Sequence, residues 1–497
     1  MSSQEEAAGT ATSIAAKAGR GLRWSLAATV ATKIGSFAMG LALARLLTPD
    51  DFGVYAIALA ATGFLMHVND VGLIAAVVHW RGRLSDIAPT ATVMAAGTSV
   101  LIYLVFWFGA PGFAALAGSP EAAPTVRLLT LTVVIDGITA IRVAALQRTF
   151  QQSKIAMANM AGFAVQAPVA IILAVGGAGA YSFVVGQLAQ AAVTGAVVFW
   201  WARLPILLAL DRATAKALLR YGLPAAAGLG VEALLMNADY TVVGRLLGAT
   251  ALGYYLLAFN ISSWVASTLG TAIRYVSVAG FARLSEQEDR LSDGVRQAVS
   301  VLVLAVLPVV TVMSVLAAPL VALLYGPRWA PAASALTFLM LFALIRLLTG
   351  LALDVLMATG ATRTALAVNA VWAVALVPAL VVGTRLDGIR GTAVSHVLTG
   401  TVIALPIFAL ALHRAGVHLR PIGRGLVRPL LAAMVAAGSA HLVNSAVGNH
   451  VLLQLFCGGT VGLVVYVTLA LPPQTIRDHV VRFTTTIRAY SAGSTNG

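Results

Sequence analysis

Long apolar runs recur along the whole chain, and they restrict the possible fold more than any other feature. Each run is about 20 residues long, enough for a helix to cross a hydrocarbon core of about 30 Å. Backbone groups inside a bilayer must bond one another, so runs of this length are helices. The sequence therefore predicts an all-α integral membrane protein with fourteen spans, at 22–46, 52–74, 88–110, 126–147, 155–176, 180–202, 223–247, 251–275, 297–325, 330–358, 363–383, 388–412, 426–446 and 450–471.

The composition agrees with a chain that lies in a lipid bilayer. Charged residues make up 10% of it and hydrophobic residues 59%, whereas soluble globular chains carry about 25% charged residues. A net charge of +14 fits a nucleic-acid partner only if the basic residues form a soluble patch. Here they lie between apolar runs, so no nucleic acid is expected. The single cysteine, Cys457, excludes an internal disulfide.

The basic residues also predict the orientation. Most of the 32 Lys and Arg residues fall in alternate connections, which the positive-inside rule assigns to the cytoplasm. Both termini are then cytoplasmic. The longest outer connection, 109–124, carries one charged residue, Glu121.

The chain also contains an internal repeat. A set of residues near the end of the first span and the start of the second recurs 200 residues later: Arg45, Leu46, Leu47, Gly53, Tyr55 and Ala58 return as Arg245, Leu246, Leu247, Gly253, Tyr255 and Ala258. Asn159 and Pro168 return as Asn369 and Pro378. Two parallel six-helix lobes around a central cavity follow, a plan known among secondary transporters.

The predicted organisation places the two lobes between polar tails, with two further helices appended to the second lobe. Its parts are a cytoplasmic tail (1–20), an N-lobe (21–202), a cytoplasmic linker helix (203–222), a C-lobe (223–412), the appended spans 13 and 14 (413–471) and a C-terminal tail (472–497). The linker is amphipathic because Arg212, Lys216 and Arg220 are four residues apart and share one helical face. Thr48, a helix-capping residue, followed by Pro49 and two acids predicts a tight hairpin between the first two spans.

Motifs for catalysis are missing from the sequence. It contains no phosphate loop, no His/Cys metal spacing and no nucleophile motif. We therefore expect no enzymatic activity, no catalytic residues, no metal and no cofactor.

The functional signal is polar residues inside apolar spans. A charge at a helix centre costs about 2.5–3.5 kcal/mol on insertion scales, so several such residues require a polar surface to face. We predict a cationic path for an anionic passenger; its candidate substrate-binding residues are Arg23, Lys33, Arg45, Arg142, Arg148, Asn237, Arg245, Arg274 and Arg346. The alternative is that the arginines near span ends extend to the membrane surface without a transport role.

Acidic residues in or near spans are candidates for coupling to an ion gradient: Asp70, Glu232 and Asp239. Glu232 and Asp239 are two helical turns apart and share a face. We predict that one of these two acids pairs with Lys33. The pair is either a salt bridge that substrate or an ion breaks during transport, or a static pair that fixes helix packing. His67 and His396 are potential proton relays, although a lone histidine in a helix is more often structural.

Several stretches resemble a known family. ARLLTPDDFGVYA, Asn69-Asp70-Val-Gly72-Leu73, ALQRTFQQSKIA, LLRYGLPAAAG with NADYTVVGRLLGATALGYYLLA, FARLSEQEDRL and GPRWAPAASALTFL occur in this order within residues 20–415. They resemble Wzx-type polysaccharide flippases of the multidrug/oligosaccharidyl-lipid/polysaccharide exporter superfamily. That family uses basic residues on spans one, two, four, seven and eight, a role for which this chain offers Lys33, Arg45, Arg142, Arg245 and Arg274. Its second span departs from the pattern, having only His67.

The resemblance implies a function. It predicts a bacterial inner-membrane flippase that carries a polyprenyl-(pyro)phosphate-linked oligosaccharide to the outer leaflet by alternating access. A proton or sodium gradient is the expected driving force, a polysaccharide polymerase a possible partner, and a monomer the expected state. The alternatives are a multidrug antiporter of the same superfamily and a membrane glycan polymerase or ligase; the basic spans count against the first and the poor outer loops against the second.

Overall fold

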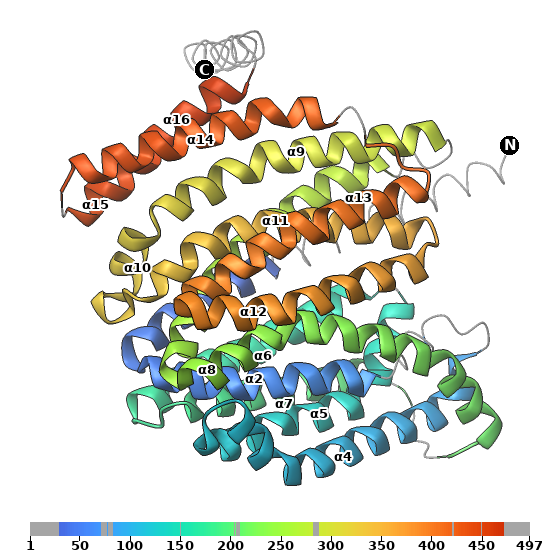
Figure 1. The fold of residues 1–497 in the computed structure, drawn as a ribbon. Coiled ribbons are helices and arrows are strands. Elements are labelled where there is room, and N and C mark those ends of the chain that lie inside the picture. The colour runs from blue at the N-terminus through green and yellow to red at the C-terminus, as the bar shows by residue number, and fades with distance from the viewer. Residues whose placement is uncertain are drawn as a thin grey trace, which may run out of the picture. The chain divides into compact units, whose positions relative to one another are not determined.

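A computed structural model describes residues 29–70, 77, 83–149, 151–202, 204, 209–281, 288–419, 422–448 and 450–471, without the side chains at 68, 70, 221–236, 271–281, 288–290 and 422–424. Within these ranges the regular secondary structure is entirely helical (Figure 1). The predicted all-α fold class is confirmed.

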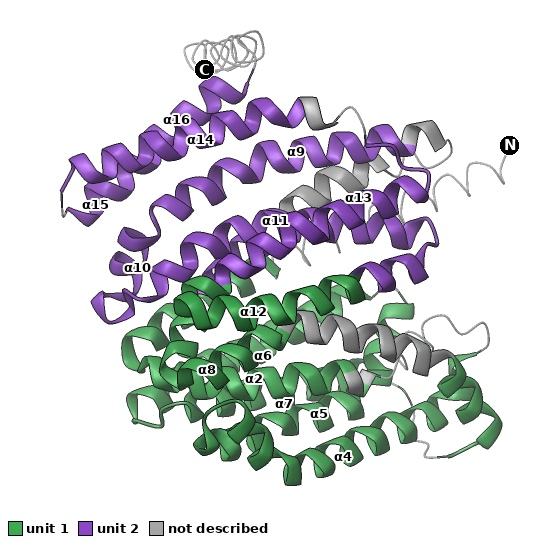
Figure 2. Ribbon diagram, viewed as in Figure 1, with its two compact units in different colours: residues 1–257, 369–392 green, residues 258–368, 393–497 purple. Residues whose placement is uncertain are grey.

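The chain divides into two compact units (Figure 2). Unit 1 contains residues 1–257 and 369–392, and unit 2 contains residues 258–368 and 393–497. The division into an N-lobe and a C-lobe at 203–222 stays a prediction.

Unit 1 is built around α5 (Ala123–Arg148). Its other helices are a helix over residues 29–46, α2 (Pro49–Asp70), α4 (Leu84–Leu116), α6 (Gln152–Val175), α7 (Tyr181–Ala202), the first part of α8 (Arg212–Phe281) and the middle of α12 (Thr362–Thr399). The central helix packs against α2, α4 and α7, and α6 packs against α7. Small residues permit this close packing, since a Cβ on Gly137 would overlap Ser99 of α4.

Unit 2 is a second helical bundle. It contains the second part of α8, α9 (Glu288–Val315), α10 (Ala317–Tyr325), α11 (Ala332–Ala358), both ends of α12, α13 (Leu405–Arg414), α14 (Ile422–Ala446), α15 (Val451–Leu453) and α16 (Gly459–Ala470). The π-helical turns η3 (Gly400–Ala404) and η4 (Gln454–Gly458) precede α13 and α16. α9 packs against α11 and α14, and α14 packs against α16 (Figure 1).

The predicted spans coincide with helices. Each of the fourteen ranges is helical over most of its described residues. Ten helical stretches in the described part of the chain are long and apolar enough to cross a membrane. Two of these contain a break, one at Gly248 and one at Asp387 and Gly388, where neighbouring spans were predicted to meet. The crossing of the bilayer fourteen times stays a prediction.

Three details of the prediction are wrong. The outer connection 109–124 is mostly helical, because α4 continues to Leu116 and the 3₁₀ helix η1 (Pro120–Ala122) follows after three residues. The single span 297–325 is two helices that meet at Leu316, where ψ is 18°. The linker is not a separate helix, because α8 runs from Arg212 without a break to Gly248. Its basic residues are exposed, as an amphipathic segment requires.

The predicted hairpin is confirmed in both copies. Thr48 and Asp51 cap α2 reciprocally: the Asp51 amide donates to the Thr48 hydroxyl (3.2 Å) and the Thr48 amide donates to the Asp51 carboxylate (2.9 Å). Gly248 turns the second copy with a φ of 82°, a conformation that costs glycine little.

The two hairpins touch through a symmetric contact inside unit 1. A Cβ on Gly53 would overlap the carbonyl oxygen of Ala249, and a Cβ on Gly253 would overlap that of Pro49. Both glycines and both carbonyls are 200 residues apart, so the contact is isologous. The Thr250 hydroxyl also donates to the Asp50 carboxylate at 3.0 Å, again across 200 residues. The two hairpin tips are therefore related by a local pseudo-two-fold axis.

Replacing either glycine with alanine should destabilise the protein. In Gly53→Ala and Gly253→Ala the new methyl group meets backbone, which moves only at a cost of about 1–3 kcal/mol. We expect a lower melting temperature of the detergent-solubilised protein in both variants. Gly97→Ala in α4 is the matched control because its methyl group meets no atom within 4 Å; it should leave the melting temperature unchanged or raise it. Equal melting temperatures for all three variants would contradict the contact.

Candidate functional site

Arg142 is buried in unit 1 rather than displayed on a surface. Its side chain is 3% exposed, and its guanidinium lies 3.7 Å from the centroid of the Phe199 ring in α7. Its Nε atom is buried without a hydrogen-bond partner among the described residues. Stacking on an aromatic face is a stable arrangement for a desolvated guanidinium, so the described contact of Arg142 is structural.

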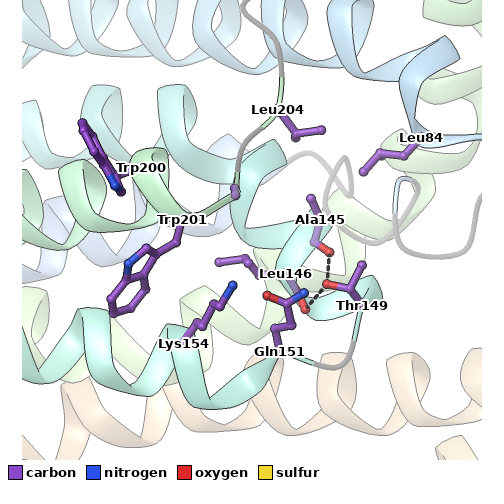
Figure 3. A pocket seen from close by; sticks show the side chains of 10 residues that line it. Leu84, Ala145, Leu146, Thr149, Gln151, Lys154, Trp200, Trp201 and Leu204 are labelled. Atoms are coloured by element: carbon purple, nitrogen blue, oxygen red, sulfur yellow. Dashed lines mark hydrogen bonds between the residues drawn. The ribbon is translucent and has the colours of Figure 1, made fainter.

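A cavity lies just beyond Arg142, where α5 ends, α6 begins and α7 ends (Figure 3). Its volume is about 570 Å³, and its lining residues are Leu84, Ala145, Leu146, Thr149, Gln151, Lys154, Trp200, Trp201, Ala202 and Leu204. All of them lie at one end of unit 1, because the helices alternate in direction. In the orientation predicted from the sequence, this end would face the cytoplasm.

The cavity combines a cation, an amide and indole rings. Figure 3 shows the Lys154 side chain between Trp201 and Gln151. The Thr149 hydroxyl donates to the carbonyls of Ala145 and Leu146, at 3.0 and 3.2 Å. None of the described lining residues is acidic. The cavity is therefore suited to a negatively charged group.

Asp239, a predicted coupling residue, is fully buried and 1% exposed. The Tyr255 hydroxyl donates to its carboxylate at 2.8 Å. Both residues are on α8, one on either side of the break at Gly248. The bond closes the second hairpin, so Asp239 has at least one structural role. Its predicted ion pair with Lys33, which is half-buried in the helix over residues 29–46, stays a prediction.

Two further polar residues meet at Gly63 of α2: Asn237 from α8, and His67 from α2 itself. The Asn237 amide lies against Gly63, where an added Cβ would approach its Oδ1 to 2.9 Å. The His67 Nδ1 lies 2.7 Å from the Gly63 carbonyl oxygen. This bond to the preceding helical turn occupies one ring nitrogen of His67 and favours the structural interpretation.

The paired arginines Arg45 and Arg245 are both exposed near the hairpin tips. The guanidinium of Arg245 donates to the Ala115 carbonyl (3.4 Å), in the last turn of α4. A cation near a helix C-terminus is favourable because the carbonyls there carry partial negative charge. Beside this contact, Gly118 lies so close to the Gly244 carbonyl oxygen that a side chain at position 118 would overlap it. The φ of Gly118 is 87°, which also favours glycine.

In unit 2, Arg346 of α11 reaches the second part of α8. Its guanidinium donates to the Ser263 hydroxyl at 2.9 Å and lies 5.3 Å from the Phe259 ring centroid. His396 of α12 is 2% exposed, and the centroid of its ring is 4.5 Å from the centroid of the Phe342 ring.

The remaining predicted residues have no described side-chain geometry or only a partial one. Arg23 lies outside the described residues, as do the side chains of Asp70, Glu232 and Arg274. Arg148 ends α5 and is half-buried beside the cavity. Roles for these residues stay predictions.

Comparison with protein families decides the relationship. The family model described as a polysaccharide biosynthesis protein matches residues 42–334. The chain belongs to this family. The match includes both hairpins, the cavity at the end of α5 and most of the predicted polar residues.

Two curated proteins support the membership over nearly the whole length. The succinoglycan biosynthesis transport protein ExoT of Rhizobium meliloti (strain 1021) is 25% identical over 467 residues, which are 91% of this chain and 92% of that protein. The lipopolysaccharide biosynthesis protein WzxC of Escherichia coli (strain K12) is 23% identical over 385 residues, which are 76% of this chain and 77% of that protein.

Solved structures show the same fold. The lipid II flippase MurJ in an inward closed conformation superposes with a TM-score of 0.73 and 12% identity, over 92% of this chain and all of MurJ. An inward-facing multidrug resistance transporter of the MATE family and the MOP superfamily gives 0.62 and 18% identity, over 77% of this chain and 94% of that one. A transport protein, a flippase and a transporter are among these relatives and structural neighbours, in agreement with the expectation that this family member is not an enzyme.

Sequence reasoning missed the lining residues Gln151, Lys154, Trp200 and Trp201. Two adjacent tryptophans at the end of an apolar span were a signal, because indoles concentrate at membrane interfaces. Their meeting with Lys154 depends on the packing of α6 against α7, which no local pattern encodes. Tyr255 was noticed only as a repeated residue and not as the partner of Asp239.

Removing the Tyr255 hydroxyl should destabilise the protein more than removing that of its repeat partner. Tyr255→Phe takes a hydrogen bond from a buried carboxylate, which costs about 1.5–3 kcal/mol. Tyr55→Phe loses a bond to the neutral amide of Gln187 (2.7 Å), a loss of about 0.5–1.5 kcal/mol. The melting temperatures of the purified variants show which substitution destabilises the protein more, and we expect the larger decrease for Tyr255→Phe. Tyr181→Phe is the control, since that ring is 41% exposed and should be neutral; a neutral Tyr255→Phe would contradict the assignment.

Proposed function

We propose that the protein is a flippase that moves a polyprenyl-(pyro)phosphate-linked oligosaccharide from the cytoplasmic to the outer leaflet for surface polysaccharide biosynthesis. Family membership over residues 42–334 carries this proposal. The fold shared with a lipid II flippase and the names of two curated relatives support it. Alternating access is the mechanism we propose, by analogy with transporters of this fold.

The polar residues support an anionic passenger. The candidate substrate contacts are basic, apart from Asn237, and a cationic drug would instead favour an acidic path. Arg45 and Arg245 are exposed at one end of unit 1, and Lys154 lines a cavity at the other. This distribution favours a phosphate-bearing lipid over a cationic drug as the substrate.

We further propose that the protein lies in the bacterial inner membrane with both termini in the cytoplasm, as the positive-inside rule indicates. A monomer that passes its product to a polysaccharide polymerase is the simplest arrangement that fits this function. These proposals rest on the sequence.

Coupling to a proton or sodium gradient is also a proposal, with Asp239, Glu232 and Asp70 as the carboxylates involved. The bond from Tyr255 bears on it, because the Tyr255 hydroxyl occupies a carboxylate oxygen of Asp239 that a coupling ion would contact. We expect Asp239→Asn to weaken the dependence of transport on the ion gradient. Transport by proteoliposomes with imposed proton or sodium gradients measures this, and an unchanged dependence excludes Asp239 as the coupling residue.

Gene disruption tests the flippase proposal. We expect membranes of the disrupted strain to accumulate complete lipid-linked oligosaccharide that a membrane-impermeant oxidant such as periodate does not reach in spheroplasts. Wild-type protein supplied in trans should clear it, and so should Lys216→Gln, which removes an exposed charge from the start of α8.

The other outcomes contradict the proposal. Oligosaccharide units that accumulate on the outer leaflet indicate a polymerase or ligase, and drug sensitivity without accumulated intermediates indicates a multidrug antiporter.

A further inference from the structure

The cavity at the junction of α5, α6 and α7 contains a positive charge that no described residue neutralises. Lys154 is one of the residues that line this cavity, and its side chain is half-buried. It forms no ion pair with any described residue. A lysine in such a place is normally paired or turned to water. Its ammonium group, with three donors and no acceptor, can donate hydrogen bonds to an acceptor such as a phosphate oxygen.

The same cavity contains an unused acceptor. The Gln151 side-chain oxygen is buried and has no hydrogen-bond partner among the described residues. Leaving a buried acceptor unpaired costs about 1–3 kcal/mol, so a ligand with a hydroxyl or ammonium donor is favoured here. Gln151 precedes α6 without capping it through its side chain. The partial positive charge at this helix end therefore also acts on the cavity.

The two tryptophans connect the cavity to the membrane. Trp200 is 82% exposed at the end of an apolar span, where an indole lies at the level of lipid headgroups. Trp201 is half-buried and lines the wall opposite Gln151, with Lys154 between them (Figure 3). An aromatic belt accounts for Trp200 alone. It does not account for a volume of about 570 Å³, which is in the range of small-molecule sites.

We propose that this cavity binds the headgroup of a lipid that carries both a phosphate and a hydroxyl group. Lys154 binds the phosphate, Gln151 accepts a hydrogen bond from the hydroxyl, and Trp201 packs on the carbon atoms between them. Anionic phospholipids of the bilayer and polyprenyl pyrophosphate glycans share this chemistry. The site is on unit 1 alone and does not depend on transport activity, although its cytoplasmic location rests on the proposed orientation.

Native mass spectrometry of the purified full-length protein with added phosphatidylglycerol tests the proposal. We expect Lys154→Gln to weaken retention of the lipid by about tenfold, because a hydrogen bond to a charged group is lost. Lys154→Arg should retain binding. Lys216→Gln removes an equal charge elsewhere and should bind like wild type. Diacylglycerol, with the same chains and no phosphate, should not be retained specifically.

A second pair of probes tests the role of Gln151. Phosphatidylmethanol keeps the phosphate of phosphatidylglycerol but lacks its hydroxyl groups, so wild type should prefer phosphatidylglycerol by roughly threefold or more. Gln151→Leu should abolish that preference while retaining both lipids. This comparison stands even if Lys154→Gln fails to fold.

The outcomes separate the two lipid sources and the two proposals. Displacement of phosphatidylglycerol by undecaprenyl pyrophosphate identifies a site for the transported lipid, and no displacement identifies a site for bilayer phospholipid. Equal retention by wild type and Lys154→Gln, or no preference for phosphatidylglycerol over diacylglycerol, overturns the site. Neither result bears on the gene-disruption test, which can fail or succeed independently.

Discussion

The contact between the two hairpin tips is the constraint on which unit 1 depends. Gly53 and Gly253 each face a carbonyl oxygen of the other copy so closely that no side chain fits between them. Lipid supplies little hydrophobic force for helix association, so close backbone packing through small residues has to provide it. The helices that carry the polar residues of unit 1, α2 and α8 above all, are positioned by this crossing.

The buried charges share a second rule, because each described one has an aromatic partner. The buried pairs are Arg142 with Phe199 and Asp239 with Tyr255, and the half-buried Arg346 lies in the same way beside Phe259. A ring face or a hydroxyl group stabilises the charge in each pair. A transported anion that approached Arg142 or Arg346 would have to compete with these contacts. The cavity beside Lys154 offers a cation without that competition.

The fold was largely predictable because apolar length and turn chemistry act locally. The runs located the helices, and Thr48 with Asp51 located the first hairpin. The prediction failed where the sequence signal was ambiguous. Gly109, Pro111 and Gly112 indicated a loop, but α4 continues through them. The helix ends at Leu116, shortly before Gly118, whose φ is 87°. The site was less predictable, since the partners of Arg142 and Lys154 come from α7, far away in sequence.

The spacing within each tip has a consequence for how such a protein arises. Pro49 and Gly53 are one helical turn apart, as are Ala249 and Gly253. Each hairpin therefore presents, on one face, a carbonyl oxygen and a glycine without a side chain, which accepts the carbonyl oxygen of the other copy. A face of this kind complements a copy of itself. Duplication of one ancestral hairpin therefore creates both sides of the contact in a single genetic event, with no second surface to evolve.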